Sequence, residues 1–465
     1  MKILFVIYDN GSQINDFPLA ISYLAASLLE AGHEVKIYSS DVYHYPPEHL
    51  TEYLDKTHFD VVGFGFCGGY FQYKQFLKIS EAVNKSINRK NFTYILGGPG
   101  PGAGPEYFLR KGNADFVCIG EGEKTIVELC AILGKVGREY LPQVNGLAYV
   151  KDGKLVKTTP RKLIEDLDTI PFPARDLFPI EHYVLVPYPN KAHTDRLLPM
   201  LTTRGCPYHC NFCYRYIPGM RFRKPEKVVE EMELLVDKYR VNYIVFFDEL
   251  TMFPGKTEEL CNVIINAKLD IKWLCNGRLN FAKPELLKLM KKSGCTFINY
   301  GIESYDNQVL KNMHKQLTLD VIDKGIKDTI SEGISPGLNI IFGNYGDNAQ
   351  TLQSGINFIL KYNDYSQIRT IRPVTPYPGS ELYYDAIKMG KLKDIADFYE
   401  NKHKNSDLMT INYTDLTDEE FYNELYNANK ILLNDHYEHQ TEENDQLLKK
   451  MYLERDASFR GFRHT

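Results

Sequence analysis

Three cysteines at short spacing are the residues of this chain that point most directly to chemistry. Cys206, Cys210 and Cys213 have the pattern Cys-x3-Cys-x2-Cys. Three thiolates at this spacing can close on one inorganic cluster, and iron–sulfur clusters of the four-iron type are normally held by four cysteines. One iron would therefore lack a protein ligand, and an open metal position is typical of a catalytic site. The amine and carboxylate of an amino-acid-like ligand can chelate such an iron.

Two other interpretations of the cysteine loop are a zinc knuckle and a redox-active thiol pair. Zinc requires a fourth ligand, and the loop offers only His209, whose position beside Cys210 makes shared chelation awkward. We therefore favour an iron–sulfur site. The remaining cysteines are scattered among apolar neighbours, and each is expected to be a small buried residue: Cys67, Cys118, Cys130, Cys261, Cys275 and Cys295.

The composition indicates a cytoplasmic protein without a nucleic-acid partner. Nine cysteines in a chain with no recognisable secretion signal fit a reducing compartment. The formal net charge of −5 provides no basic excess to neutralise phosphates. No apolar run reaches the roughly 18 residues expected of a membrane span. The apolar residues 3–8 are interpreted as a first strand and not as a signal peptide.

The first 135 residues alternate short apolar runs with amphipathic segments, which is typical of a parallel αβ sheet. Strands are predicted at 3–8, 34–38, 61–66, 94–97 and 116–119, and helices at 19–31, 47–56, 73–88, 106–111 and 124–133. We expect a doubly wound, Rossmann-like sheet, which binds ligands at the carboxyl ends of its strands. Glycine-rich loops at 8–12, 67–70, 97–100 and 120–123 follow those ends, and together they favour a large, flat ligand.

A hairpin at 146–157 and a linker rich in proline and aromatic residues at 159–199 precede a second αβ series. Strands are predicted there at 200–203, 243–247, 272–275, 296–301, 336–342 and 366–373, and helices at 226–239, 257–268, 284–292, 319–332 and 349–361. Six βα units predict a partial, open-sided barrel with its reactive groups at the carboxyl ends of the strands. The expected domains are 1–140 (front domain), 141–198 (hairpin and linker), 199–380 (barrel) and 381–465 (helical C-terminal region).

Acidic residues follow two of the predicted barrel strands. Asp248 and Glu249 end one apolar run, and Glu303 ends another. A buried carboxylate is costly unless it is paired with a cation or a hydrogen-bond donor. An ammonium group on a ligand would supply that partner, and a structural salt bridge is the alternative. The run His436-Tyr437-Glu438-His439 is interpreted as a solvated helix face and not as a metal site.

On these residues, the chain resembles the radical S-adenosylmethionine superfamily. Phe212 completes the pattern Cys-x3-Cys-x-aromatic-Cys, and the runs 246–251, 276–278, 301–304 and 375–380 are similar to later strand-end motifs of the superfamily. The resemblance implies a 4Fe-4S cluster on the three cysteines, with S-adenosylmethionine on the open iron. The residues it places near S-adenosylmethionine are Phe212, Asp248, Glu249, Arg278, Glu303 and Ser304. The run 342–346 departs from the Gly-Leu-Pro-Gly-Glu that is frequent in the family.

The front domain resembles the cobalamin-binding domain of the B12-dependent subfamily. Residues 20–26 and 32–35 are similar to the opening of that domain, and 97–99 and 120–123 are similar to its later loops. The cobalamin contacts implied by the resemblance are Asp9, Cys67, Gly68, Gly69, Tyr70, Gly97, Gly98, Pro99, Gly120, Glu121 and Gly122. The sequence lacks the Asp-x-His-x-x-Gly motif that supplies a histidine to cobalt in many cobalamin proteins. This suggests a corrin whose lower face is not held by histidine.

The resemblance implies a cobalamin-dependent methyltransferase. A 5′-deoxyadenosyl radical would take hydrogen from an unactivated carbon, and methylcobalamin would then methylate that carbon. No acid–base catalytic residue is assigned. The expected partners are a small-molecule substrate and a reducing protein such as flavodoxin or ferredoxin. The alternatives are a radical oxidative cyclase or rearrangement enzyme, and a non-catalytic cobalamin or redox sensor. A methylthiotransferase is disfavoured, because its extra cluster cysteines and basic tail are missing from the sequence.

Overall fold

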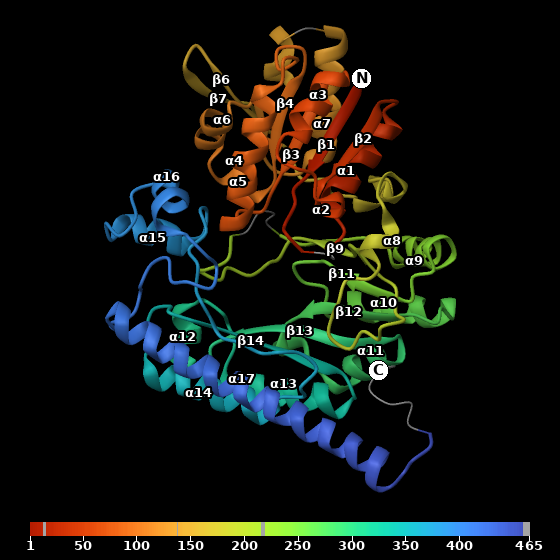
Figure 1. Ribbon diagram of the computed structural model, residues 1–465, viewed down its shortest axis with the longest axis vertical. Helices are drawn as coiled ribbons and strands as arrows, with labels where there is room; N and C mark the ends of the chain where they lie inside the picture. The colour runs from red at the N-terminus through yellow and green to blue at the C-terminus, as the bar shows by residue number, and fades with distance from the viewer. Residues whose placement is uncertain (13–14, 137, 215–218, 459–465) are drawn as a thin grey trace.

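Two parallel sheets, one above the other in Figure 1, organise the chain. The computed structural model describes residues 1–12, 15–136, 138–214 and 219–458. The front domain stands above the barrel, and the C-terminal segment runs alongside both. This is the α/β architecture that the sequence predicts.

The front sheet has seven strands in the order β2-β1-β3-β4-β5-β6-β7. They are β1 (Lys2–Ile7), β2 (Glu34–Ser39), β3 (Val61–Gly65), β4 (Thr93–Gly97), β5 (Phe116–Cys118), β6 (Leu147–Lys151) and β7 (Lys154–Lys157). The first five strands pair in parallel, and the antiparallel hairpin β6–β7 continues the sheet beside β5. The predicted hairpin therefore exists, but it belongs to the front sheet and not to the linker segment.

Helices cover both faces of the front sheet. α1 (Leu19–Glu30) and α7 (Gly122–Ala131) bury their apolar residues on one face, and α3 (His49–Lys56), α4 (Tyr70–Lys85) and α6 (Pro105–Gly112) do so on the other. The short helices α2 (Ser40–Tyr43) and α5 (Pro99–Ala103) were not predicted. The order in which strands are added to the sheet reverses between β1 and β3, and ligands of doubly wound sheets bind at the carboxyl ends of the strands at such a point.

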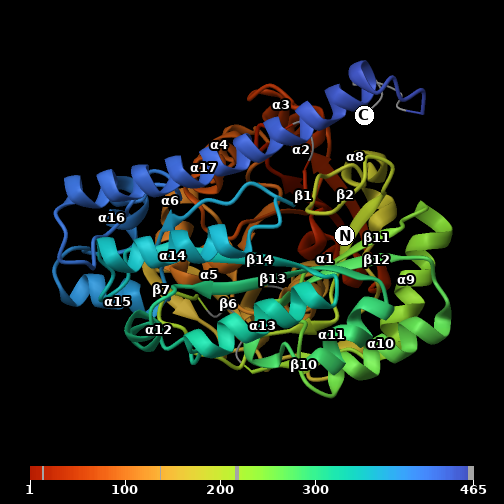
Figure 2. The same ribbon diagram turned by 90° about the horizontal axis from the view of Figure 1, so that it is seen from below.

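The second sheet is a half-barrel of six parallel strands in the order β15-β14-β13-β12-β11-β8. The strands are β8 (Leu197–Met200), β11 (Tyr243–Phe246), β12 (Lys272–Gly277), β13 (Cys295–Glu303), β14 (Ser335–Phe342) and β15 (Arg372–Pro373). The covering helices are α9 (Pro225–Tyr239), α10 (Lys256–Ala267), α11 (Pro284–Lys292), α13 (Leu319–Ser331) and α14 (Ala349–Tyr362), and Figure 2 shows them along one side of the sheet. The first strand begins before the predicted 200–203, and the last is much shorter than the predicted 366–373.

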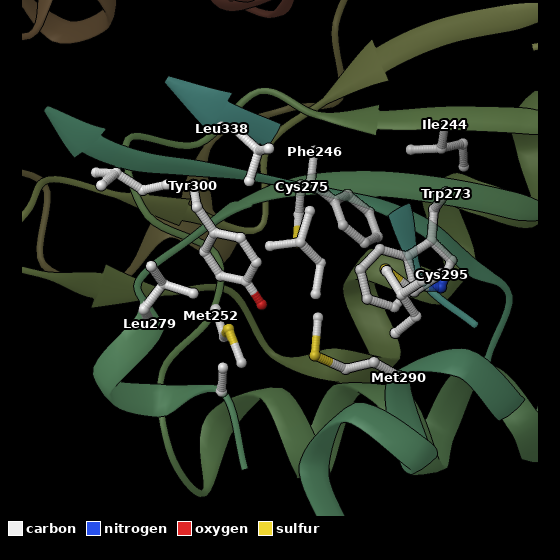
Figure 3. Close-up of a cluster of buried hydrophobic side chains, with 14 of the residues drawn as sticks. Ile244, Phe246, Met252, Trp273, Cys275, Leu279, Met290, Cys295, Tyr300 and Leu338 are labelled. Carbon is white, nitrogen blue, oxygen red and sulfur yellow. The ribbon is translucent and has the colours of Figure 1, made fainter. Parts of the chain in front are cut away.

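The core of the barrel lies between its sheet and its helices, as Figure 3 shows. Trp273 is fully buried there, and its indole nitrogen donates a hydrogen bond to the carbonyl of Ser293 at 2.8 Å. The thiols of Cys275 and Cys295 belong to this core. Cys118, Cys130 and Cys261 are also buried, as predicted, whereas Cys67 is exposed, which contradicts the expectation for that residue.

The linker contacts both domains. Tyr183 is fully buried, and its hydroxyl donates to the Asp41 carboxylate of the front domain at 2.7 Å. Three residues later, Val186 packs against Leu197 and Tyr243 on the inner face of the half-barrel. The linker thus closes one end of the barrel while it holds the front domain in place.

The C-terminal region is helical, as predicted, and it also contacts both domains. It contains α15 (Glu381–Lys388), α16 (Ile395–Asp397) and α17 (Asp418–Leu448). The ring of Tyr399 stacks on Tyr73 of the front domain with centroids 4.8 Å apart. α17 lies along α14 and buries Phe421 and Leu425 in the core of the barrel (Figure 2). Among the described residues, no helix is both long enough and apolar enough to span a membrane.

Candidate active site

The cysteine loop joins two short antiparallel strands beside the first barrel strand. These strands are β9 (Thr203–Arg204) and β10 (Arg221–Phe222), and Arg204 pairs directly with Arg221. Between them lie the three cysteines, of which Cys206 and Cys210 are partly exposed and Cys213 is exposed. The loop therefore stands at the carboxyl end of the barrel strands, where reactive groups of such barrels lie.

The thiols of the loop influence one another. Although part of Cys213 is exposed to solvent, protein atoms crowd its thiol, and this burial, followed by the neighbouring charges of Cys210 and Cys206, raises the pKa of Cys213 to about 11. A cavity of about 200 Å³ opens over Cys210 and Cys213 and is also lined by His209, His314 and Glu381. Among the described residues, no group of three or more His, Cys, Asp or Glu side chains is arranged to hold a metal ion. The thiols of Cys206, Cys210 and Cys213 nevertheless lie on one loop and are not buried in a core. They form the set of sulfur donors that a four-iron cluster requires.

Asp248 holds the start of the cysteine loop. Its carboxylate accepts hydrogen bonds from the amides of Thr202 (2.7 Å) and Thr203 (3.0 Å) and from the hydroxyls of Thr202 (2.5 Å) and Thr251 (2.9 Å). The side chain is almost fully buried, and this burial raises its pKa to about 6 against the opposing effect of the hydrogen bonds. Because four protein donors occupy both oxygens, the structure places Asp248 as a support of the loop and not as the expected ligand contact.

Glu249 and Arg278 lie on either side of the loop. Glu249 is exposed, and its carboxylate accepts a hydrogen bond from the amide of Gly205 at 3.0 Å. The guanidinium of Arg278 lies 3.5 Å from the centroid of the Tyr208 ring. Its proximity lowers the pKa of Cys206, although burial dominates and the net shift is upward. Both residues thus reach the cysteine loop, as their predicted role requires.

Glu303 meets a cation that sequence reasoning missed. Its carboxylate lies 2.9 Å from the ammonium of Lys315, and both side chains are largely buried. The same ammonium lies 5.7 Å from the ring centroid of Phe212, directly before Cys213. Glu303 has a positive φ of 71° beside a β-bulge in β13, and Ser304 is buried next to it. Glu303, Lys315 and Phe212 therefore gather beside the cysteines.

Amide side chains cross the inner face of the barrel in a row that was also not predicted. Asn276 on β12 accepts a hydrogen bond from Asn299 on β13 at 3.0 Å, and Asn299 accepts one from Asn339 on β14 at 2.6 Å. A side chain at Gly337 would collide with Asn299, since its Cβ would lie 2.6 Å from the amide oxygen. A polar residue between two buried positions of each strand was the available sequence signal.

The rim of the front domain is built from backbone. The amides of Cys67, Gly68 and Gly69 all donate to the side-chain oxygen of Gln72, at 3.1, 2.9 and 3.2 Å. Gly98 has φ +91°, and a Cβ there would lie 2.6 Å from the carbonyl oxygen of Phe66. These loops follow the adjacent strands β3 and β4, so the structure brings residues 67–70 and 97–99 together, as predicted.

The other residues expected at the rim have different surroundings. Asp9, after β1, accepts hydrogen bonds from the amide of Gly11 at 2.7 Å and pairs with His44 at 3.0 Å. Tyr70 lies edge-on to His403, a histidine of the C-terminal region that the sequence did not indicate. His403 is fully buried, and burial lowers its pKa to about 4, so it is neutral at physiological pH.

The loop of Gly120, Glu121 and Gly122, whose contact with cobalamin stays a prediction, is joined to the barrel through Glu121. The Glu121 carboxylate is buried against Arg204 and Arg221 at 2.9 Å each and also accepts the amide of Ile164 at 2.7 Å. Burial alone would raise its pKa, but these hydrogen bonds outweigh it and leave the pKa below its usual range. Gly122 packs closely on Leu24 of α1. The Glu121 carboxylate thus binds the barrel.

Comparison with known proteins agrees with the geometry of both domains. The model of the radical SAM superfamily matches residues 200–359, and that of the B12 binding domain matches residues 16–130. An uncharacterized methyltransferase of Pyrococcus horikoshii is 31% identical over 400 residues, which cover 83% of this chain and 83% of the relative. The chain belongs to the radical S-adenosylmethionine superfamily, in the group whose members carry a B12-binding domain.

Further relatives of this radical S-adenosylmethionine protein include enzymes of more than one reaction type. An anaerobic magnesium-protoporphyrin IX monomethyl ester cyclase of Rubrivivax gelatinosus is 27% identical over 86% of this chain and 72% of the relative. Among solved structures, the methyltransferase TsrM of Kitasatospora setae, with cobalamin and a 4Fe-4S cluster bound, has a TM-score of 0.66 at 16% identity, covering 83% of this chain and 75% of that chain. This likeness shows a shared fold.

The residues of this chain fit the groups that the family uses. The three thiols provide the donors for a 4Fe-4S cluster, and the Glu303–Lys315 pair and Glu249 bring charge to the region where the amino acid part of S-adenosylmethionine would lie. The glycine-lined rim of the front domain allows the close backbone approach that a planar corrin requires. The chain is thus a radical S-adenosylmethionine enzyme with sites suited to a cluster, S-adenosylmethionine and cobalamin.

Proposed function

We propose that this enzyme methylates an unactivated carbon of a small-molecule substrate. The observation that carries the proposal is the 31% identity to an uncharacterized methyltransferase over 83% of this chain and 83% of the relative. A hopanoid C-2 methylase of Rhodopseudomonas palustris, 26% identical over 68% of this chain and 55% of the relative, supports the same reaction class. When bound, the cluster and S-adenosylmethionine supply a 5′-deoxyadenosyl radical, and cobalamin supplies a methyl group.

The residues of the chain divide the work of binding between the two domains. Cys206, Cys210 and Cys213 hold the cluster, and Asp248 fixes the loop that carries them. The exposed Glu249 carboxylate offers its charge to the ammonium group of S-adenosylmethionine, and Glu303, whose charge Lys315 balances, lies beside the cluster loop. The rim at 67–70 and 97–99 takes up the corrin. The barrel between these sites excludes water, which protects a radical from side reactions.

The substrate surface is the row of asparagines on the inner face of the barrel. The amides of Asn276, Asn299 and Asn339 offer donors and acceptors without net charge. Such a surface suits a neutral, polar molecule better than a strongly charged one. This assignment supports a small-molecule substrate and leaves its carbon skeleton open.

Electrons reach the cluster from a small reducing protein such as a flavodoxin or ferredoxin. The cavity over Cys210 and Cys213 supports this part of the proposal, because it brings two of the cluster ligands to the surface of the protein. A single low-potential electron is required for each cleavage of S-adenosylmethionine.

A cyclase is the second candidate, because the Rubrivivax gelatinosus relative aligns with 86% of this chain. The two reactions are separated by the fate of the methyl group. The purified enzyme is reconstituted anaerobically with iron, sulfide and hydroxocobalamin, desalted, and examined by absorption spectroscopy. It is then reduced and incubated with an anaerobic metabolite extract and S-adenosylmethionine that carries a deuterated methyl group. A methylated product gains the label, whereas a cyclised product loses hydrogen and carries none.

The expected result is cobalamin retained beside the iron–sulfur absorbance, 5′-deoxyadenosine, and a product that carries the deuterated methyl group. A protein that holds the cluster but no cobalamin would overturn the methylation proposal while leaving the radical chemistry intact. An unlabelled product with lower mass than its substrate would favour the cyclase.

A further inference from the structure

Both ends of the cysteine loop meet one carboxylate of the front domain. Arg204 and Arg221 face each other across the β9–β10 pair, at the two points where the loop leaves and returns. One oxygen of Glu121 lies 2.9 Å from Arg204, and the other lies 2.9 Å from Arg221. Glu121 follows β5 of the front sheet, so a single side chain of the front domain binds both ends of the cysteine loop of the barrel.

The ion pairs of Glu121 with Arg204 and Arg221 are buried, and further residues contact the same groups. The Glu121 side chain is 1% exposed and also accepts the amide of Ile164 in the linker. Glu123 adds a second bond to the guanidinium of Arg204 at 2.5 Å. The face of that guanidinium lies 5.4 Å from the ring of Tyr23 on α1. The front domain therefore surrounds Arg204 with two carboxylates and an aromatic ring.

This network constrains orientation more tightly than an apolar contact between the domains does. Arginine presents its donors in a fixed planar fork, so a carboxylate that bonds it sets an orientation as well as a distance. Two arginines and two glutamates balance their charges, and removal of one partner leaves an uncompensated buried charge. The stacking of Tyr399 on Tyr73, by contrast, is an apolar contact that tolerates sliding. The Glu121 network thus sets the position of the cysteine loop relative to the front domain, whereas Asp248 holds the start of the loop within the barrel.

We infer that Glu121 is a positioning residue that fixes the cluster loop against the front domain and so sets the separation between the two metal cofactors. The inference rests on the proposed function for the identity of the group in the front domain. A methyl group and a radical must reach the same carbon, so the separation of their sources controls whether radical formation leads to product. Glu121 acts through Arg204 and Arg221 and touches neither cofactor itself.

The test uses the full chain with Glu121→Gln, which keeps the shape of the side chain and removes its charge. Glu128→Gln is the matched control, because Glu128 lies on α7, the helix that Glu121 directly precedes, and pairs with Arg161 and not with an arginine of the cysteine loop. Hydrogen exchange is followed by mass spectrometry in the apo protein. Glu121→Gln should raise the exchange rate of amides in 205–214 about tenfold, with β1 and β3 unchanged, because only the loop loses its anchor. Glu128→Gln should leave both segments as in the wild type.

Arg221→Gln removes the ion pair with Glu121 from the barrel side, and it tests the same inference if Glu121→Gln does not fold. In protein loaded with cluster and cobalamin, pulsed electron paramagnetic resonance measures the separation between the reduced cluster and cob(II)alamin. One narrow separation is expected for the wild type and Glu128→Gln, and a broadened distribution for the two anchor variants. Unchanged loop exchange, or a separation as narrow as that of the wild type, would overturn the inference. If the wild type retains no cobalamin, the proposed function fails, and the exchange data still decide whether Glu121 anchors the loop.

Discussion

The front domain and the barrel are built from the same parallel βα units, but their strand ends carry opposite kinds of residue. The rim of the front domain consists of backbone and glycine, as in the three amides of residues 67–69 that converge on Gln72. The rim of the barrel carries thiols and charged side chains, of which Glu303 and Lys315 form a nearly buried pair. Backbone rims accept the flat face of a large group, whereas charged rims bind small groups with defined charge.

Two acids, one on each rim, depart from this division between a backbone rim and a charged rim. Glu121 is an acid on the front rim, and it serves the barrel by binding Arg204 and Arg221. Asp248 is an acid on the barrel rim, and its carboxylate accepts hydrogen bonds from Thr202 and Thr203 at the start of the cysteine loop and from Thr251. The buried carboxylates of Glu121 and Asp248 thus both support the cysteine loop, and the exposed Glu249 remains for a ligand.

The largest effect should come from the barrel thiols. Cys213→Ala should abolish the iron–sulfur absorbance and reduce 5′-deoxyadenosine below detection, because two thiolates cannot hold a four-iron cluster. Cys67→Ala, which removes an exposed thiol of the front rim, should keep the full cluster. Iron content and absorption spectra check both variants. A cluster that survives in Cys213→Ala, or one that is lost in Cys67→Ala, would break the division between the two rims.

The charged pair of the barrel should give the next largest effect. Lys315→Met leaves the Glu303 carboxylate nearly buried without its cation and should cost about 3–5 kcal/mol of unfolding free energy. The double variant with Glu303→Gln should recover most of that loss. Lys324→Met is the control, since Lys324 pairs with Asp328 on the exposed face of α13, where such pairs contribute about 0.3–0.5 kcal/mol. Urea unfolding of the apo proteins measures all three, and equal losses in Lys315→Met and Lys324→Met would contradict the prediction.

Much of this architecture could be predicted from the sequence, because its signal is local. Apolar runs and amphipathic periods gave the strands and the longer helices, and α11 has the predicted bounds Pro284–Lys292. The helix α5 was missed because Pro99–Ala103 consists of proline, glycine and alanine and has no helical pattern. The cysteine site followed from spacing within a few residues.

The partners of charged residues could not be predicted, because they depend on contacts distant in sequence. Glu121 stands in a glycine-rich loop that looks like a ligand loop, and its partner Arg221 lies far along the chain on a strand of two residues. Lys315 follows a short helix and has the sequence context of a surface lysine, yet it is 6% exposed. The bulge in β13 that turns Glu303 toward it has no sequence pattern of its own.

On the rim of the front domain, substitution of a glycine should lower stability and cobalamin binding through steric collision and not through a change of charge. Gly98→Ala would place a methyl group 2.6 Å from the carbonyl oxygen of Phe66 at φ +91° and should cost about 2–3 kcal/mol. Cobalamin retention should fall with it, while the barrel keeps its cluster. Gly153→Ala has a similar φ of +75° with no atom within 4 Å, and it should cost only about 1 kcal/mol. Thermal unfolding and cobalamin content distinguish the two, and a Gly98→Ala protein that retains cobalamin fully would refute the role of this rim.

The smallest effect concerns pH and the end of β14. Asp347 accepts the amides of Gly343 (3.0 Å) and Asn344 (2.9 Å) and is nearly buried, and this burial raises its pKa from 3.8 to about 7. The folded protein therefore binds more protons than the unfolded chain between about pH 4 and pH 7, so this group makes stability fall as the pH rises through that window. Relative to Asp347→Asn, the wild type should lose at most about 1.4 kcal/mol per pH unit within this window. Asp323, whose pKa is lowered overall by the hydroxyls of Tyr362 and Tyr305 despite its burial, should show the opposite slope relative to Asp323→Asn. Denaturant midpoints at pH 4, 5.5 and 7 test both signs, and parallel curves for the wild type and Asp347→Asn would contradict the raised pKa of Asp347.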